Sequence, residues 1–336
     1  MKRQQQLTIL ASRPLLGLIA TVAILVVASV APIIFNQPYF YYVSYIVLQY
    51  VILATAWNIF GGYAGYVNFG AAGFFGLGAY VSGYLYHTYN LGLLAGLVAA
   101  AAACAALGAL VGYATARLRG LYFAIATLAI SLLIQVVFIN MPQVGQSFGF
   151  IVTPPPPPPP YPSYIAFLFP VMIAIALISV LASWFLLRSR FGIGLFSIKD
   201  DELAAESVGV PTFKLKLLAA TMSGLFMGLA GAPFPYYQLY ISPDIISFTI
   251  SINSVAMPLI GGIGTLSGPV VGAVLLSAIQ QVASVSISSD INVLIVGVLI
   301  IIFIVAAPDG LLGIFRRLIG KPSTQGEKSY NDRRWW

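Results

Sequence analysis

The sequence has very few charged residues for its length. Of its 336 residues, 7% are Asp, Glu, Lys or Arg, whereas 60% are hydrophobic, and the mean hydropathy is +0.94. A soluble domain is about 25% charged, so this chain could not cover a water-facing surface. The shortage excludes an ordinary soluble protein and predicts a chain embedded in lipid.

Cysteine and histidine are nearly absent. The single cysteine, Cys104, cannot form an internal disulfide, and its Ala/Leu/Gly surroundings predict a small buried hydrophobe. The single histidine, His87, ends an apolar run, and we expect it at the membrane interface because no second metal ligand is near. No cluster of Asp, His or Cys suggests a metal site, and no nucleophile and base suggest an enzyme.

A nucleotide-binding loop is also missing. The segment GGIGTLSG at 261–268 lacks the lysine that reaches phosphate in the G-x-x-x-x-G-K-[ST] motif. The net charge of +7 could suggest nucleic-acid binding, but the basic residues form small groups between apolar runs rather than a stripe. We therefore expect no nucleic-acid partner and no ATP site in this chain.

Long apolar runs dominate the rest of the sequence. A membrane helix needs about 20 mostly apolar residues, and this length predicts an all-α, polytopic bundle of ten spans, with eight as the alternative. The predicted spans are 15–35, 42–61, 70–88, 92–115, 121–140, 163–187, 215–238, 246–263, 267–284 and 290–307.

Basic clusters lie at the ends of these spans, at Lys2/Arg3/Arg13, Arg117/Arg119, Arg188/Arg190/Lys199, Lys214/Lys216 and Arg316/Arg317/Lys321. The positive-inside rule places them in the cytoplasm, and an even number of spans separates each cluster from the next, as that placement requires. The prediction is a cytoplasmic N-terminus (1–14), a transmembrane domain (15–317) and a cytoplasmic, disordered tail (318–336). Within the domain, the 188–213 loop is cytoplasmic and the 141–162 loop is external.

Charged residues lie at the ends of the spans and not at their centres. Transporters driven by protons or voltage need ionisable groups at membrane depth. The absence of such groups from the predicted spans indicates that the energy for transport comes from outside the membrane. On the external side, seven consecutive prolines, Pro154 to Pro160, predict a stiff, exposed spacer.

The segment KDDELAAESVGVP at 199–211 is unusually charged. Four of the chain's nine carboxylates fall within it. Acids suit the first turn of a helix, Ser197 is a candidate N-cap, and Gly209 with Pro211 makes a stop. The pattern predicts a short cytoplasmic helix, either docked on a partner or simply solvated.

Several segments, in this order, resemble the branched-chain amino acid permeases of ATP-driven (ABC) importers, in particular the M-type subunit. The resemblance covers about residues 40–317 and departs from the family at VGQSFGF, at the proline run and near Asn68. The matching segments are TAWNIFGGYAGYVNFGAAGFFGLGAY (55–80), GLYFAIATLAI (120–130), RFGIGLFSIKDDELAAESVGVPTFKLKLLA (190–219), GLAGAPFPYYQLYISPDIISF (228–248), LIGGIGTLSGPVVGAVLL (259–276) and APDGLLGIFRR (307–317).

The resemblance implies that the 199–209 helix is a coupling helix that docks on a cytoplasmic ATPase subunit holding ATP and Mg²⁺. It also implies a homologous permease partner and an extracytoplasmic binding protein, in a bacterial inner membrane. The positions that correspond to the family's docking residues are Asp201, Glu202, Ala204, Ala205, Glu206 and Gly209.

Glycines interrupt two of the predicted helix pairs. Transporters place broken helices around the translocation path, although glycines also serve plain helix packing. The candidate path residues are Asn58, Gly61, Gly62, Gly65, Asn68, Gly70, Gly261, Gly262 and Gly264.

These features favour a transport subunit without chemistry of its own, which passes branched-chain amino acids or a related small polar solute. A carrier or channel working alone is the alternative, and it predicts an ionisable or filter-like site in the membrane. The residues do not separate leucine-type substrates from urea or short amides, nor a homodimeric from a heterodimeric permease.

Overall fold

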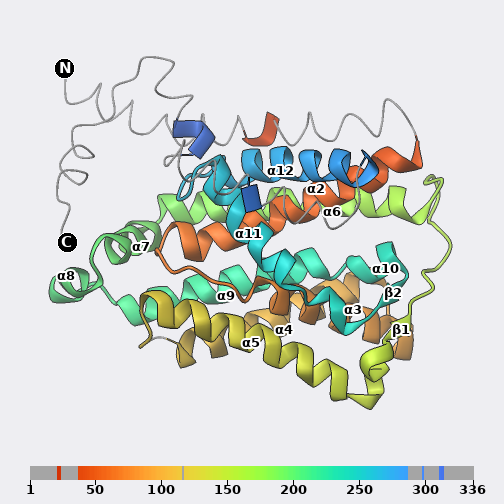
Figure 1. The fold of residues 1–336 in the computed structure, drawn as a ribbon, viewed down its shortest axis with the longest axis horizontal. Helices are drawn as coiled ribbons and strands as arrows, with labels where there is room; N and C mark the ends of the chain where they lie inside the picture. Colours follow the sequence, from red (N-terminus) through yellow and green to blue (C-terminus); the bar gives the residue numbers. More distant parts are fainter. Residues whose placement is uncertain (1–20, 24–36, 116, 287–296, 299–309, 314–336) are drawn as a thin grey trace.

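The protein is a bundle of helices (Figure 1). The computed structural model describes residues 21–23, 37–115, 117–286, 297–298 and 310–313. In chain order its helices of more than five residues are α2 (Pro38–Trp57), α3 (Ala71–Tyr89), α4 (Leu93–Ala114), α5 (Gly120–Asn140), α6 (Tyr164–Arg188), α7 (Arg190–Asp200), α8 (Glu202–Ser207), α9 (Thr212–Gly231), α11 (Phe248–Gly261) and α12 (Gly268–Ser286).

Shorter elements connect these helices. A π-helical turn, η1 (Asn58–Gly62), continues α2, and α10 (Phe234–Gln238) follows α9. The 3₁₀ turns are η2 (Pro142–Val144), η3 (Gln146–Phe148) and η4 (Pro243–Ile245). Strands β1 (Phe150–Ile151) and β2 (Tyr240–Ile241) pair antiparallel, with Phe150 opposite Ile241.

Helices occupy every predicted span that falls within the described residues. Six of them are long and apolar enough to cross a membrane, and α12 contains a shorter apolar helix, Gly268–Val282. The all-α, polytopic fold class is therefore confirmed. The predicted spans 15–35 and 290–307, the 1–14 segment and the 318–336 tail lie outside the described residues.

Local sequence signals set several helix ends. Pro38 stands in the first turn of α2, where its missing N–H costs nothing. The Ser163 side chain caps α6 by accepting a hydrogen bond from the Ala166 amide at 3.3 Å. Asn90 ends α3 in the left-handed conformation, with φ 51°. The helices thus begin and end at residues suited to those positions.

Small residues bring α4 and α9 into close contact. A Cβ added to Gly108 would lie 2.7 Å from the Ala220 carbonyl oxygen, and one added to Gly228 would lie 2.3 Å from the Cys104 sulfur. The Cys104 side chain is fully buried, as the sequence predicted. Packing of this kind replaces the hydrophobic effect, which does not drive helix association in lipid.

The two ends of the bundle hold the segments that the charge pattern assigned to opposite sides. Helices α7 and α8 lie at the left end in Figure 1, and β1 and β2 lie at the right end. The pairing of Phe150 with Ile241 joins two segments predicted to be external. His87 lies near them in the last turn of α3, with its ring 5.1 Å from that of Phe150. The proline run leads from β1 to a turn before α6 and is mostly exposed.

Candidate functional site

The predicted coupling loop contains two helices. Helix α7 continues through Ser197 to Asp200, and α8 begins after Asp201. Ser197 is therefore not the N-cap, because its hydroxyl donates to the Ile193 carbonyl within α7 at 3.1 Å. Asp201 caps α8 instead, accepting from the Ala204 amide at 3.0 Å. This cap, in the middle of the acidic run 200–202, divides the segment into two helices.

The predicted docking positions do not all face outward. Ala205 is buried, and the Glu202 side chain is only 10% exposed. The sequence did not single out two apolar neighbours, Leu203 (60% exposed) and Val208 (80% exposed). The docking positions that are exposed are Asp201, Ala204, Glu206 and Gly209. The outer face of α8 is thus mixed, with both acidic and apolar side chains.

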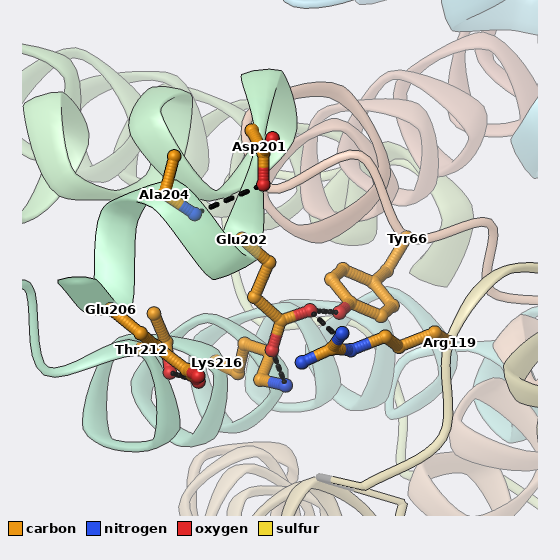
Figure 2. A network of polar contacts seen from close by, with 8 residues as sticks. All are labelled: Tyr66, Arg119, Asp201, Glu202, Ala204, Glu206, Thr212 and Lys216. Atoms are coloured by element: carbon orange, nitrogen blue, oxygen red, sulfur yellow. Dashed lines mark hydrogen bonds and ion pairs between the residues drawn. The ribbon is translucent and has the colours of Figure 1, made fainter.

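Glu202 binds three side chains of its own chain (Figure 2). Its carboxylate accepts from Lys216 Nζ at 2.6 Å and pairs with Arg119 Nε at 3.2 Å. The Tyr66 hydroxyl donates to the same carboxylate. Glu202 therefore joins α8 to the start of α9, the start of α5 and the segment between η1 and α3.

The charges around Glu202 keep it ionised. Burial acts to raise the pKa of this carboxyl, but the hydrogen bonds from Lys216 and Tyr66 and the charges of Lys216 and Arg119 outweigh it. The pKa of Glu202 therefore lies below its usual range. The ion pairs persist at neutral pH and are lost only as the pH falls through this lowered value.

Lys199 makes a second link from the loop to the same segment. Its Nζ donates to the Gly62 carbonyl at 3.0 Å. A Cβ added to Gly65, which has φ +79°, would lie 3.0 Å from the Lys199 side chain. Two side chains on opposite sides of the α7–α8 junction therefore contact residues 62–66.

Asn58 joins the two glycine-rich segments. Its side-chain amide donates to the Thr265 carbonyl and accepts from the Gly264 amide, both at 2.9 Å. The residue is fully buried in η1. A Cβ added to Gly62 would meet both Asn58 Oδ1, at 1.9 Å, and the Gly264 nitrogen, at 2.9 Å. Residues 206 and 207 positions apart in the sequence thus meet at one polar contact, where there is no room for a further side chain.

The other predicted path residues divide between two places. Gly261 and Gly262 are buried beside this contact, where α11 ends and α12 begins. Asn68 and Gly70 instead fix the start of α3, with the Gly70 amide donating to Asn68 Oδ1 at 2.7 Å. There, the Phe69 amide donates to Thr127 of α5. The predicted set is therefore two clusters, of which only the first contacts the coupling loop.

Sequence reasoning missed the inward-facing partners of Glu202. Arg119 and Lys216 were interpreted only as markers of the cytoplasmic side. Their position next to an acidic loop on that same side was the available signal, because a carboxylate removed from water needs a cationic partner. Among the described residues, no group of three or more His, Cys, Asp or Glu could hold a metal.

The family model described as the branched-chain amino acid transport system / permease component matches residues 39–304. The high-affinity branched-chain amino acid transport system permease protein LivM of Salmonella typhimurium is 30% identical over 311 residues, which are 83% of this chain and 71% of that protein. LivM of Escherichia coli strain K12 is 30% identical over 307 residues, 82% of this chain and 70% of that protein.

A more distant relative matches a shorter stretch. The autoinducer 2 import system permease protein LsrC of Klebsiella pneumoniae is 30% identical over 105 residues, 30% of each chain. No solved structure matches. These findings support an importer permease and not a carrier or channel working alone. The chain belongs to the branched-chain amino acid permease family of ABC importers.

Proposed function

We propose that the chain passes branched-chain amino acids, or a related small polar solute, across a bacterial inner membrane. A binding protein delivers the solute outside, and a homologous permease forms the other wall of the path. ATP and Mg²⁺ act in separate ATPase subunits that dock on the 188–213 loop, and both termini are cytoplasmic. The names of the relatives and the placement of basic residues support this assignment.

One observation carries the proposed coupling: the docking loop directly contacts the glycine-rich segment at residues 62–66. Lys199 holds the Gly62 carbonyl, and Glu202 holds the Tyr66 hydroxyl. Coupling between sites requires a contiguous physical connection that both sites can bias. A partner that shifts α8 would pull on residues 62–66 through both contacts.

The same movement reaches the contact between the glycine-rich segments. Asn58, four residues before Gly62, holds the Thr265 carbonyl and the Gly264 amide. The two segments are packed without space between them at Gly62. Passage along this route therefore requires the segments to separate, and we propose that ATP-driven motion of the coupling loop breaks and remakes the Asn58 contact.

Docking is tested at Leu203, which is exposed on α8 and lies outside the Glu202 network. We expect Leu203→Glu to abolish copurification of the ATPase subunit, because it places a charge in an interface that buries apolar surface. Leu203→Met is the matched control and should retain the ATPase. The amount of permease in the membrane should not change in either variant. Full copurification with Leu203→Glu would contradict docking at α8.

The substrate class is tested by uptake in cells that contain the complete transporter. We expect uptake of radiolabelled leucine that depends on this chain and that excess isoleucine or valine suppresses. Excess urea or acetamide should not suppress it. Chain-dependent uptake of urea with no uptake of leucine would replace the amino-acid assignment with a short-amide one, while leaving the coupling proposal intact.

A further inference from the structure

A cavity of about 720 Å³ lies between the ends of α4, α5 and α9 and the coupling helix α8. Three cations line it, Arg117, Arg119 and Lys216, together with the carboxylates of Glu202 and Glu206. Its lining therefore has one net positive charge. Arginine forks are suited to phosphate oxygens, so the composition of the wall favours a singly charged anion.

Contacts within the chain already satisfy both carboxylates. Glu202 is matched by Lys216 and Arg119, and Glu206 accepts from the Thr212 hydroxyl at 2.6 Å. Arg119 uses its Nε for Glu202, and its side chain is half exposed. A guanidinium has five N–H donors, and the ion pair uses only the one on Nε. The N–H groups of the two terminal nitrogens lie outside that ion pair. Arg117 is exposed at the cavity wall. The cavity wall thus offers the guanidinium groups of Arg117 and Arg119 to an anion.

An apolar stripe on α4 leads into this cavity. Exposed residues recur every three or four positions along the helix, at 94, 98, 102, 106, 110 and 113 and, just beyond its end, at 117, and so form a band that winds gradually around its outer side. Leu94 (76% exposed), Val98 (65%) and Leu110 (65%) form the stripe, and Tyr113 (69%) and Arg117 end it. A lipid-facing helix has this order, with aromatic and basic residues at the headgroup level. Tyr113 also packs edge-on against Phe213, with ring centroids 6.0 Å apart, at the cavity rim.

We propose that this cavity binds the phosphate headgroup of an anionic phospholipid whose acyl chains lie along the α4 stripe. The stripe is the reason for a lipid rather than a free phosphate, since a soluble anion would leave it unused. The net positive lining is the reason for an anionic lipid such as phosphatidylglycerol, whose headgroup adds no cation. Basic pockets between membrane helices on the cytoplasmic side recognise acidic lipids in this way.

The test uses the full-length chain, purified in detergent with the subunits that accompany it. Native mass spectrometry measures the lipid that remains bound after addition of phosphatidylglycerol or phosphatidylcholine. We expect selective retention of phosphatidylglycerol and roughly tenfold weaker retention in Arg117→Gln, from the loss of a charged hydrogen bond. Arg190→Gln, an exposed arginine on α7 outside the cavity, is the matched control and should retain the lipid.

A second pair of measurements distinguishes binding of the intact lipid from binding of a phosphate group alone. Tyr113→Ala should weaken phosphatidylglycerol retention, and soluble glycerol 1-phosphate should not displace the lipid. Displacement by glycerol 1-phosphate would replace the lipid site with a free-phosphate site. Equal retention of phosphatidylcholine, or equal loss in Arg117→Gln and Arg190→Gln, would overturn the proposal. Since binding is read without transport, none of these outcomes depends on the proposed importer mechanism.

Discussion

Gly261→Ala is expected to leave little folded protein. A Cβ at this position would lie 1.8 Å from the Gly268 carbonyl oxygen and 2.8 Å from the Gly272 nitrogen. Both atoms belong to the backbone of α12, so no side chain can rotate to relieve the clash, and the ends of α11 and α12 must separate. Overpacking costs about 1–3 kcal/mol and occasionally more, and a clash with backbone atoms belongs at the upper end, a large part of the stability of a folded domain.

The measurements for Gly261→Ala are the monodisperse fraction on size-exclusion chromatography after detergent extraction and the midpoint of thermal unfolding. Gly92→Ala is the matched control, because Gly92 has an ordinary φ of −63° and nothing lies within 4 Å of its Cβ position. The control should behave as the native chain does. A native midpoint for Gly261→Ala would show that the backbones of α11 and α12 are not in close contact at this junction.

Glu202→Gln is expected to separate ATP hydrolysis from solute uptake. The substitution keeps the shape of the side chain but removes the charge that holds Lys216, which is 5% exposed, and Arg119. It also weakens the contact with Tyr66. Since α8 keeps its exposed face, the ATPase should stay bound. We expect uptake per ATP hydrolysed to fall about tenfold, which corresponds to about 1.4 kcal/mol of coupling free energy.

Loss of stability must be distinguished from loss of coupling. Leaving Lys216 buried without its carboxylate costs about 3 kcal/mol, so Glu202→Gln should also lower the thermal midpoint. Adding Lys216→Met should restore the midpoint but not the coupling. Tyr66→Phe removes only one hydroxyl and should reduce uptake per ATP with little change in the midpoint. Full coupling in proteoliposomes with both Tyr66→Phe and Glu202→Gln would refute the proposed connection.

The helices could be predicted because their signal is local. Apolar runs of about 20 residues found the long helices of the bundle within the described residues. The even number of spans between basic clusters placed the 62–66, 188–213 and 264–265 segments on one side, where the structure joins them. Assigning the basic clusters to one side of the membrane needed no tertiary information, because the side of each cluster follows from its position along the chain relative to the spans.

The site was less predictable because its contacts are long-range. Whether Glu202 faces a partner or its own chain depends on Tyr66, 136 positions earlier in the sequence, and on Arg119 and Lys216. The pattern of acids along 199–209 is the same in both cases. The break at Asp201 was also missed, because capping by Ser197 and by Asp201 both fit the local sequence, and only the backbone geometry selects between them.

The buried position of Cys104 has a practical consequence. Its sulfur is fully covered and donates to the Phe74 carbonyl at 3.3 Å, and the chain has no other cysteine. A cysteine introduced at Val208 or Phe148, which are 80% and 85% exposed, would therefore be the accessible thiol for a spin label or fluorophore. The native sequence thus serves as a background for watching both ends of the bundle during turnover.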